Sequence, residues 1–117
     1  VVHFQNAITN LMDNAVKHRK QDEPLDIYIR TWNDNDKLHF SIRDTGQGIK
    51  KENVKKIFDK FYRVHTGNKH DVKGFGLGLA YVKKIVDLHQ GTIKCESELG
   101  KGTKFTISLP ILKEDRN

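Results

Sequence analysis

Residues 37–49 read KLHFSIRDTGQGI, and this stretch decides how the rest of the chain is interpreted. Apolar Leu38, Phe40 and Ile42 alternate with polar residues, which is the period of a strand with one buried face. Asp44 continues the same inward phase. A carboxylate that points into a core is costly unless a hydrogen-bond donor meets it. The pattern therefore predicts a strand that delivers an acidic side chain to a buried site.

The ligand that Asp44 suits follows from its chemistry. An ionised carboxylate only accepts hydrogen bonds, so it fits the exocyclic amino group of adenine and repels the carbonyl oxygen that guanine has at that position. Gly46 and Gly48 are expected to leave room for a flat ligand beside the backbone. An Asx turn that ends the strand is the alternative interpretation of DTG.

The flanking sequence predicts two hairpins. Residues 25–30 alternate like residues 38–43, and the turn formers at 33–37 join them. A second hairpin is expected to join residues 92–97 to residues 104–109. The apolar residues of the first hairpin that are expected to face the core are Leu25, Ile27, Ile29, Leu38, Phe40 and Ile42.

The chain opens with a helical pattern at residues 1–18, in which a polar row lies opposite an apolar stripe. The row consists of Asn10, Asn14 and Lys17. The amide oxygen of Asn14 suits Mg²⁺, and Lys17 can neutralise phosphate charge. An exposed helix face is the alternative interpretation. The apolar stripe consists of Phe4, Ile8, Leu11, Met12 and Ala15.

Two further helices are expected at residues 51–61 and 75–91, separated by a long loop at 62–74. The first of them has Val54, Ile57, Phe58 and Phe61 on one face. The inward residues expected in the second are Leu77, Ala80, Ile85 and Leu88.

The long loop and the glycines after it suggest a phosphate site. Gly74, Gly76 and Gly78 are expected just before the last helix, where backbone N–H groups and the helix dipole attract phosphate. A loop with helix-packing glycines is the alternative. The cations that flank the loop, and that are expected to clamp a γ-phosphate, are Lys60, Arg63, Lys69 and Lys73.

Composition limits the classes of protein. The length of 117 residues predicts one domain over residues 1–117, with a frayed tail at about 112–117. The net charge of +6 is interpreted as a lysine-rich surface, and no nucleic-acid partner is expected. The single Cys95 and the lack of an apolar run of roughly 20 residues predict a cytoplasmic domain without direct membrane contact. An anchor of the parent protein in the inner membrane is compatible with this expectation.

Five segments occur in an order and spacing that resemble the histidine-kinase catalytic domain of the GHKL superfamily. They are NLMDNAVKH, DTGQGI, FDKFYRV, GFGLGL and GTKFTI, and the resemblance extends from Phe4 to Leu109. It implies a Bergerat α/β sandwich: a mixed, largely antiparallel sheet, covered on one face by about three helices, with a flexible ATP lid. The family's first strand would lie before Val1, so an N-terminally truncated domain is expected.

The resemblance also implies roles for individual residues. Asn14 coordinates Mg²⁺, Lys17 contacts phosphate, and Asp44 accepts from the adenine amino group. Asn10, Asn14 and Lys17 are the expected catalytic residues. The residues expected to bind ATP are Asn14, Lys17, His18, Asp44, Gly46, Gly48, Ile49, Phe58, Phe61, Arg63, Lys73, Gly74, Gly76, Leu77, Gly78 and Thr103.

The implied activity is transfer of the ATP γ-phosphoryl group to a histidine on a separate dimerisation domain, with a response-regulator receiver domain downstream. ATPases of the superfamily resemble one another in a glutamate four residues before the metal-binding asparagine. Asn10 stands at that position, and an amide is no base at neutral pH. Slow hydrolysis is therefore expected, and the fragment alone is expected not to label itself. The alternatives are a serine kinase of the same fold and a non-catalytic nucleotide-binding scaffold.

Overall fold

The computed structural model describes the backbone of residues 2–58 and 73–111. Side chains are described for residues 4–58 and 78–111. The helices and strands follow one another as α1 (Val2–Lys17), β1 (Ile27–Asp34), β2 (Lys37–Asp44), α2 (Lys51–Val54), α3 (Lys73–Leu88), β3 (Thr92–Glu98) and β4 (Gly102–Pro110).

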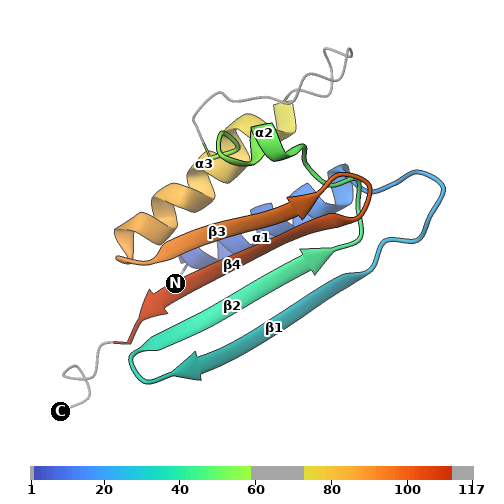
Figure 1. Ribbon diagram of the computed structural model, residues 1–117. Coiled ribbons are helices and arrows are strands. Elements are labelled where there is room, and N and C mark those ends of the chain that lie inside the picture. Colours follow the sequence, from blue (N-terminus) through green and yellow to red (C-terminus); the bar gives the residue numbers. More distant parts are fainter. Residues whose placement is uncertain (1, 59–72, 112–117) are drawn as a thin grey trace.

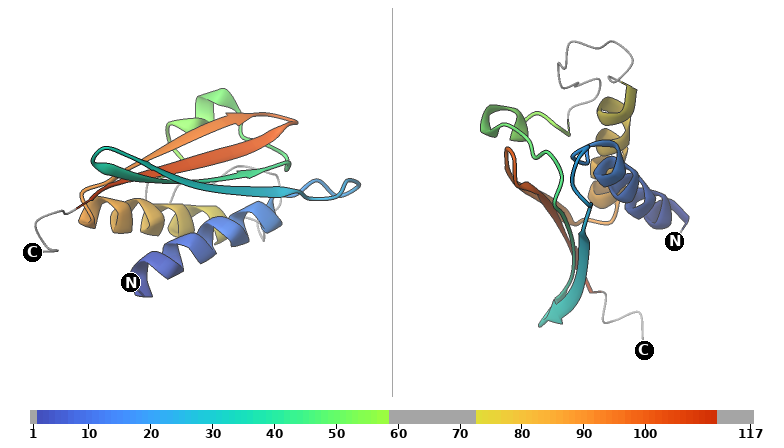
Figure 2. Two further views of the ribbon diagram at one scale, coloured as in Figure 1. Left: turned by 90° about the horizontal axis from the view of Figure 1, so that it is seen from below. Right: turned by 90° about the vertical axis from the view of Figure 1, so that its right-hand side faces the viewer.

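The fold has two layers. The four strands form an antiparallel sheet in the order β1-β2-β4-β3. Helices α1 and α3 pack against each other and cover one face of this sheet, while the short α2 lies beside β3 (Figures 1 and 2). The predicted α/β sandwich and both hairpins are therefore confirmed, and every described strand pair is antiparallel.

The core lies between the helices and the central strands. Ile42 of β2 pairs with Phe105 of β4, and Phe40 pairs with Ile107, so inward residues of adjacent strands lie side by side. The side chains that are almost completely buried are Leu11, Ile57, Leu79, Val82, Val86 and Ile107. Burial of such residues stabilises the fold by roughly 1.5–3 kcal/mol each.

Two of the expected core residues in the first hairpin are exposed. Ile29 and Leu38 are 53% and 45% exposed, although both lie on the helix-facing side of the sheet. The reason is that the β1 side of the sheet extends beyond α1 and α3, as Figure 2 shows. Alternation predicted the correct face, but the extent of the helical layer is a tertiary property.

The helix predictions need two corrections. The helix expected at residues 51–61 ends at Val54, and a turn follows that buries Ile57 completely; residues 59–61 lie outside the described part. In α3, Leu88 is 68% exposed and Ala80 is only partly buried. At about 100° per residue, Leu88 lies about 120° away from buried Val82 around the helix, so the predicted inward face was wrong for it.

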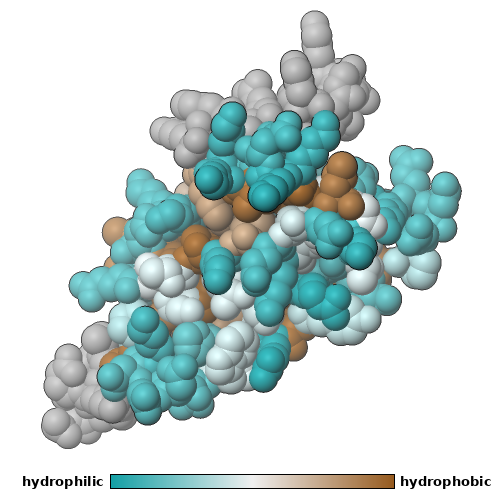
Figure 3. All heavy atoms as spheres, in the orientation of Figure 1, coloured by the Kyte–Doolittle hydropathy of each residue, from teal (hydrophilic) through white to brown (hydrophobic). Residues whose placement is uncertain are grey.

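The open face of the sheet is hydrophilic, as Figure 3 shows. Its aromatic rings are covered by cations: the guanidinium of Arg43 lies 4.2 Å from the ring centroid of Tyr28, and that of Arg30 lies 4.9 Å from Trp32. His39 stacks on Trp32 at 5.1 Å. Each cation–π contact contributes about 0.5–1 kcal/mol at an exposed site.

The core assignment predicts a contrast between two residues of the same sheet face. Ile107→Ala removes a fully buried side chain, so we expect the free energy of unfolding to fall by roughly 2–5 kcal/mol. Leu38→Ala is the matched control, because Leu38 is half exposed and its loss should cost less than about 1 kcal/mol. Urea unfolding followed by circular dichroism measures both. Equal losses in the two variants would contradict the assignment.

Candidate functional site

Asp44 ends β2 with its side chain buried at 8% exposure. The backbone N–H of Gly46 donates to Oδ1 of Asp44 at 2.8 Å, and the N–H of Thr103 also donates to this carboxylate. Burial raises the pKa of Asp44 above its ordinary value of 3.8, and the two N–H donors offset part of that rise. The Asx-type contact at DTG is thus present, and it coexists with a buried carboxylate.

The two glycines of DTGQG serve close backbone packing. A Cβ on Gly46 would lie 2.7 Å from the carbonyl oxygen of His18 and 3.0 Å from Asp44 Oδ1. Gly48 has a φ of +77°, and a Cβ there would collide with the carbonyl of Glu98. Protein backbone therefore occupies the positions that side chains would take here, and the expected room for a ligand beside these glycines stays a prediction.

Hydrogen bonds fasten the loop after Asp44 on both sides. On the α1 side, the N–H of Gln47 donates to the carbonyl of His18 at 2.9 Å, and its side chain donates to the carbonyl of Arg19 at 3.2 Å. On the β3–β4 side, the N–H of Gly100 donates to the carbonyl of Gln47 at 2.7 Å. The loop therefore joins the end of α1 to the last hairpin.

Ser97 is the second anchor on the hairpin side. The N–H of Ile49 donates to Ser97 Oγ at 2.8 Å, and this hydroxyl donates to the carbonyl of Gly102 at 2.9 Å. Ser97 Oγ also lies 2.8 Å from Thr103 Oγ1. Sequence reasoning missed Ser97, although a polar residue in the inward phase of Ile93 and Cys95 was a usable signal.

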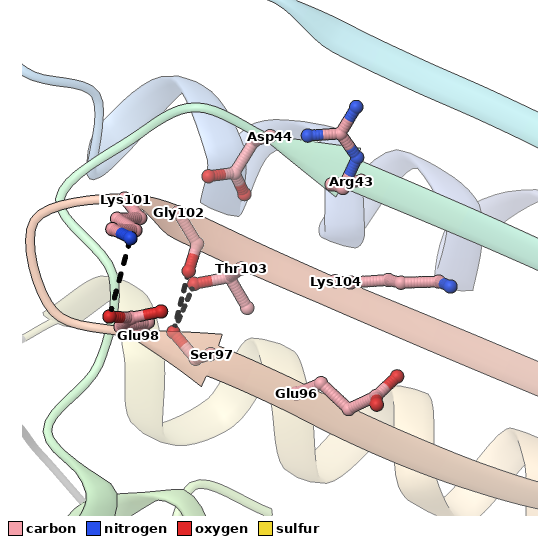
Figure 4. A pocket seen from close by; sticks show the side chains of 9 residues that line it. All are labelled: Arg43, Asp44, Glu96, Ser97, Glu98, Lys101, Gly102, Thr103 and Lys104. Atoms are coloured by element: carbon pink, nitrogen blue, oxygen red, sulfur yellow. Dashed lines mark hydrogen bonds and ion pairs between the residues drawn. The ribbon is translucent and has the colours of Figure 1, made fainter.

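A cavity of about 310 Å³ lies beside Asp44 and is shown in Figure 4. Asp44, Thr103 and Ser97 lie in the middle of its lining, between Lys101 and Glu98 on one side and Arg43, Lys104 and Glu96 on the other, and Thr103 lies between Asp44 and Ser97. Cations and carboxylates line the remainder, and Lys101 pairs with Glu98 at 3.6 Å. The lining residues are Arg43, Asp44, Glu96, Ser97, Glu98, Lys101, Gly102, Thr103 and Lys104.

A smaller hollow of about 60 Å³ lies between α1 and α3. The structure brings the predicted polar row together here, because Asn10, Asn14 and Lys17 all line the hollow with Gly78. Asn14 is buried at 8% exposure, so the alternative of a simply exposed helix face does not hold for it. The hollow is lined by Asn10, Asp13, Asn14, Lys17, Gly78 and Leu79, and Asp13 was missed from the sequence.

The donor set of this hollow fits a magnesium ion and phosphate. Asn14 and Asp13 offer oxygen ligands, which Mg²⁺ prefers, and Lys17 offers a cation. A Cβ built on Gly78 meets nothing within 4 Å, so space is open on the α3 side. Among the described residues, no group of three or more His, Cys, Asp or Glu side chains lies where it could hold a metal ion.

The glycine segment differs from its prediction. Helix α3 begins at Lys73, so Gly74, Gly76 and Gly78 lie within its first turns and not before it. Gly74 and Gly76 are nevertheless among the first four residues of the helix, whose N–H groups lack partners within it, and Gly78 is the sixth residue. The helix forms because packing of its later residues, Leu79 among them, outweighs the low helix propensity of glycine.

The remaining predicted site residues are placed as follows. The ring of Phe58 packs edge-on against Phe105 at 6.1 Å, and Ile49 belongs to the core. His18 is half buried, and its carbonyl supports the loop. Phe61 and Arg63 lie outside the described residues, as do Lys60 and Lys69. The side chains of Lys73 and Leu77 are likewise outside the described part.

Comparison with known proteins assigns the chain to a family. Residues 1–113 match the family described as histidine kinase-, DNA gyrase B-, and HSP90-like ATPase. The sensor protein RprX of Bacteroides fragilis (strain YCH46) is 68% identical over 114 residues, which cover 97% of this chain and 22% of that protein. The sensor protein SrrB of Staphylococcus aureus (strain NCTC 8325 / PS 47) is 42% identical, with coverage of 92% and 18%.

Solved structures agree in fold. The mycobacterial sensor histidine kinase MprB has a TM-score of 0.74 at 29% identity, over 90% of this chain and 70% of that one. A nucleotide-free catalytic domain of the histidine kinase ThkA has a TM-score of 0.76 at 28% identity, with coverage of 98% and 70%. None of the described helices is long and apolar enough to span a membrane.

The chain spans about a fifth of the length of the curated relatives that it matches. Family match, relatives and solved structures nevertheless agree with one another and with the two-layer fold described above. The chain therefore belongs to the family of histidine kinase-, DNA gyrase B- and HSP90-like ATPases, as an ATP-binding domain of the kind found in sensor histidine kinases.

Proposed function

We propose that this chain holds Mg-ATP between the end of β2 and the facing helices α1 and α3, and that it presents the γ-phosphoryl group to a histidine on a separate dimerisation domain. The observation that carries the proposal is the buried carboxylate of Asp44, which accepts from two backbone N–H groups beside a cavity. A buried acceptor of this kind suits the amino group of adenine.

The phosphate end of the proposed site is the hollow between α1 and α3. Asn14 and Asp13 would supply oxygen ligands to Mg²⁺ there, and Lys17 together with the N–H groups of the first α3 turns would face the phosphates. Bound Mg²⁺ would neutralise charge on the transferring group. Asn10 lines the same hollow and has no basic group to activate water.

The two ends of the site are linked through the last turn of α1. The N–H of His18 donates to the carbonyl of Asn14 at 3.1 Å, and the carbonyl of His18 accepts from Gln47 in the loop after Asp44. Positioning of the reacting groups supplies much of the rate in phosphoryl transfer. This direct link supports a fixed distance between the base and the metal.

Partners and location follow from the same proposal. The acceptor histidine would lie on a dimerisation domain of the same protein, and a response-regulator receiver domain would take the phosphoryl group next. We further propose that residues 1–117 act as one domain in the cytoplasm, in contact with ATP and these protein domains and not with nucleic acid or the membrane.

The proposal predicts the base preference of an Asp44 variant. Asp44→Asn replaces one acceptor oxygen by an amino group, so we expect affinity for Mg-ATP to fall roughly 10- to 100-fold while that for Mg-GTP falls less. Calorimetric titration of both nucleotides measures this. Unchanged affinities for ATP and GTP would remove Asp44 from the base site. Asp44→Asn should not lower the free energy of unfolding at neutral pH, because the change removes a buried charge.

The raised pKa of Asp44 predicts a pH dependence of selectivity. Only the ionised carboxylate is purely an acceptor, and it is protonated at higher pH than an ordinary aspartate. The ratio of ATP to GTP affinity should therefore fall as the pH is lowered, starting at a higher pH than for an ordinary aspartate, and Asp44→Asn should lack this dependence. The ratio cancels the titration of the phosphates, which both nucleotides share.

The same pKa has a defined effect on stability. Because folding raises it above the unfolded value, the ionised carboxylate destabilises the folded chain at pH values above the folded pKa, and this cost disappears as pH falls toward the unfolded value. A loss of folded structure between pH 8 and pH 5 would thus not originate from Asp44. Circular dichroism at both pH values is the control for the titration.

Phosphoryl transfer is expected only when an acceptor is supplied. With radiolabelled ATP, the chain alone should remain unlabelled, and a histidine-bearing dimerisation domain added to it should acquire acid-labile label. Asn14→Ala should abolish labelling if this residue holds Mg²⁺. Acid-stable label on the acceptor would indicate a serine kinase, and strong self-labelling of the chain would defeat the split site.

A further inference from the structure

The hydroxyl of Ser97 has its hydrogen-bonding capacity filled by three protein groups. A serine hydroxyl carries one hydrogen and two acceptor lone pairs. The carbonyl of Gly102 can only accept, so the single hydrogen of Ser97 is directed to it at 2.9 Å. The N–H of Ile49 can only donate, and it occupies one lone pair at 2.8 Å.

These two bonds fix the direction of the third. Ser97 Oγ and Thr103 Oγ1 lie 2.8 Å apart, and either hydroxyl alone could donate. Since the hydrogen of Ser97 is used by Gly102, Thr103 must donate to Ser97. Thr103 is 6% exposed and then keeps only lone pairs for any other neighbour.

The direction of the hydrogen bond from Thr103 to Ser97 matters because of where Thr103 lies. Thr103 is the direct cross-strand partner of Asp44, and in Figure 4 its side chain lies between Asp44 and Ser97, all three of which line the cavity. Asp44 accepts hydrogen bonds and cannot donate while it is ionised. Two neighbouring side chains therefore present acceptors at the same place.

We infer that Ser97 is a positioning residue for base selection: it holds the Thr103 hydroxyl as an acceptor, so that Asp44 and Thr103 together form an acceptor-only wall that favours a purine carrying an amino group. The inference rests on the proposed function, because it assumes that the base lies against this wall. Ser97 itself does not contact the base. It acts through the orientation of one hydrogen.

The mechanism has a clear physical consequence. When Ser97 is replaced by alanine, the hydrogen of Thr103 loses its partner and can turn toward the cavity, where it meets the amino group of adenine as donor against donor. If the site recognised the base through its shape alone, the new direction of the Thr103 hydrogen would not change the affinity. The amino group is therefore the part of the ligand to test.

The test compares ATP with purine ribonucleoside triphosphate, which lacks only the 6-amino group. In the unsubstituted chain we expect ATP to bind more tightly than this analogue. Ser97→Ala should reduce the ratio of the two affinities about fivefold, the size of one hydrogen bond. Calorimetric titration in the presence of Mg²⁺ measures all four constants, and thermal melting verifies that the variant is folded.

Variants of Thr103 supply the matched controls. Thr103→Val removes the hydroxyl at equal volume and should reduce the ratio, whereas Thr103→Ser should retain it. If Ser97 acts through Thr103, the double variant Ser97→Ala/Thr103→Val should have the ratio of Thr103→Val alone. Should Ser97→Ala be unfolded, the comparison of Thr103→Val with Thr103→Ser decides, and equal ratios in these two overturn the inference.

The outcomes separate the two proposals. If the unsubstituted chain binds neither nucleotide, the proposed function fails. If it prefers ATP and Ser97→Ala weakens ATP and the analogue equally, the proposed function stands, Ser97 is only structural, and the inference is overturned. A selective loss for ATP that disappears in the Thr103→Val background supports it.

Discussion

The rest of the site depends on one buried carboxylate and on the backbone that surrounds it. Asp44 leaves β2 directed inward, and the N–H groups of Gly46 and Thr103 donate to it. Two neutral donors compensate part of the desolvation, and burial still raises the pKa of the carboxyl group. Such a group retains acceptor capacity that the described protein contacts do not exhaust. The fold is thus stable with an acid at this position and is still suited to a ligand that can donate to it.

The loop after Asp44 connects parts of the chain that are far apart in sequence. Its backbone bonds to the carbonyl of His18 at the end of α1, and Gly100 in the β3–β4 turn bonds back to it. Glycine is required where the loop passes closest to these neighbours, at Gly46 and Gly48. Helix α1 carries Asn14, so the proposed base end and the proposed metal end belong to one hydrogen-bonded unit. In the proposed site, this link would hold the two ends of a nucleotide in one orientation.

Periodicity and composition predicted the helices, the hairpins and the inward direction of Asp44, because these follow from local geometry. The polar row of α1 was also correct, and the structure shows it facing α3. Other features depend on tertiary packing. Ile29 and Leu38 alternate correctly yet lie beyond the helical layer, and α2 is short because the chain turns to bury Ile57. Ser97 and Asp13 escaped notice because their importance arises from neighbours that the sequence does not reveal. The roles of individual residues toward ATP remain predictions.

The open side of the sheet has a further consequence for how the domain can be handled by its surroundings. Uncovered Trp32 and Tyr28 rings would favour association of this sheet face with other proteins, but Arg30, Arg43 and His39 cover their ring faces. Arg43, which lines the cavity beside Asp44, and Arg30 therefore keep their charge while their guanidinium groups are held against aromatic rings. The covering cations keep this side of the sheet polar at its surface, which lowers the tendency of an exposed sheet face to associate with other proteins.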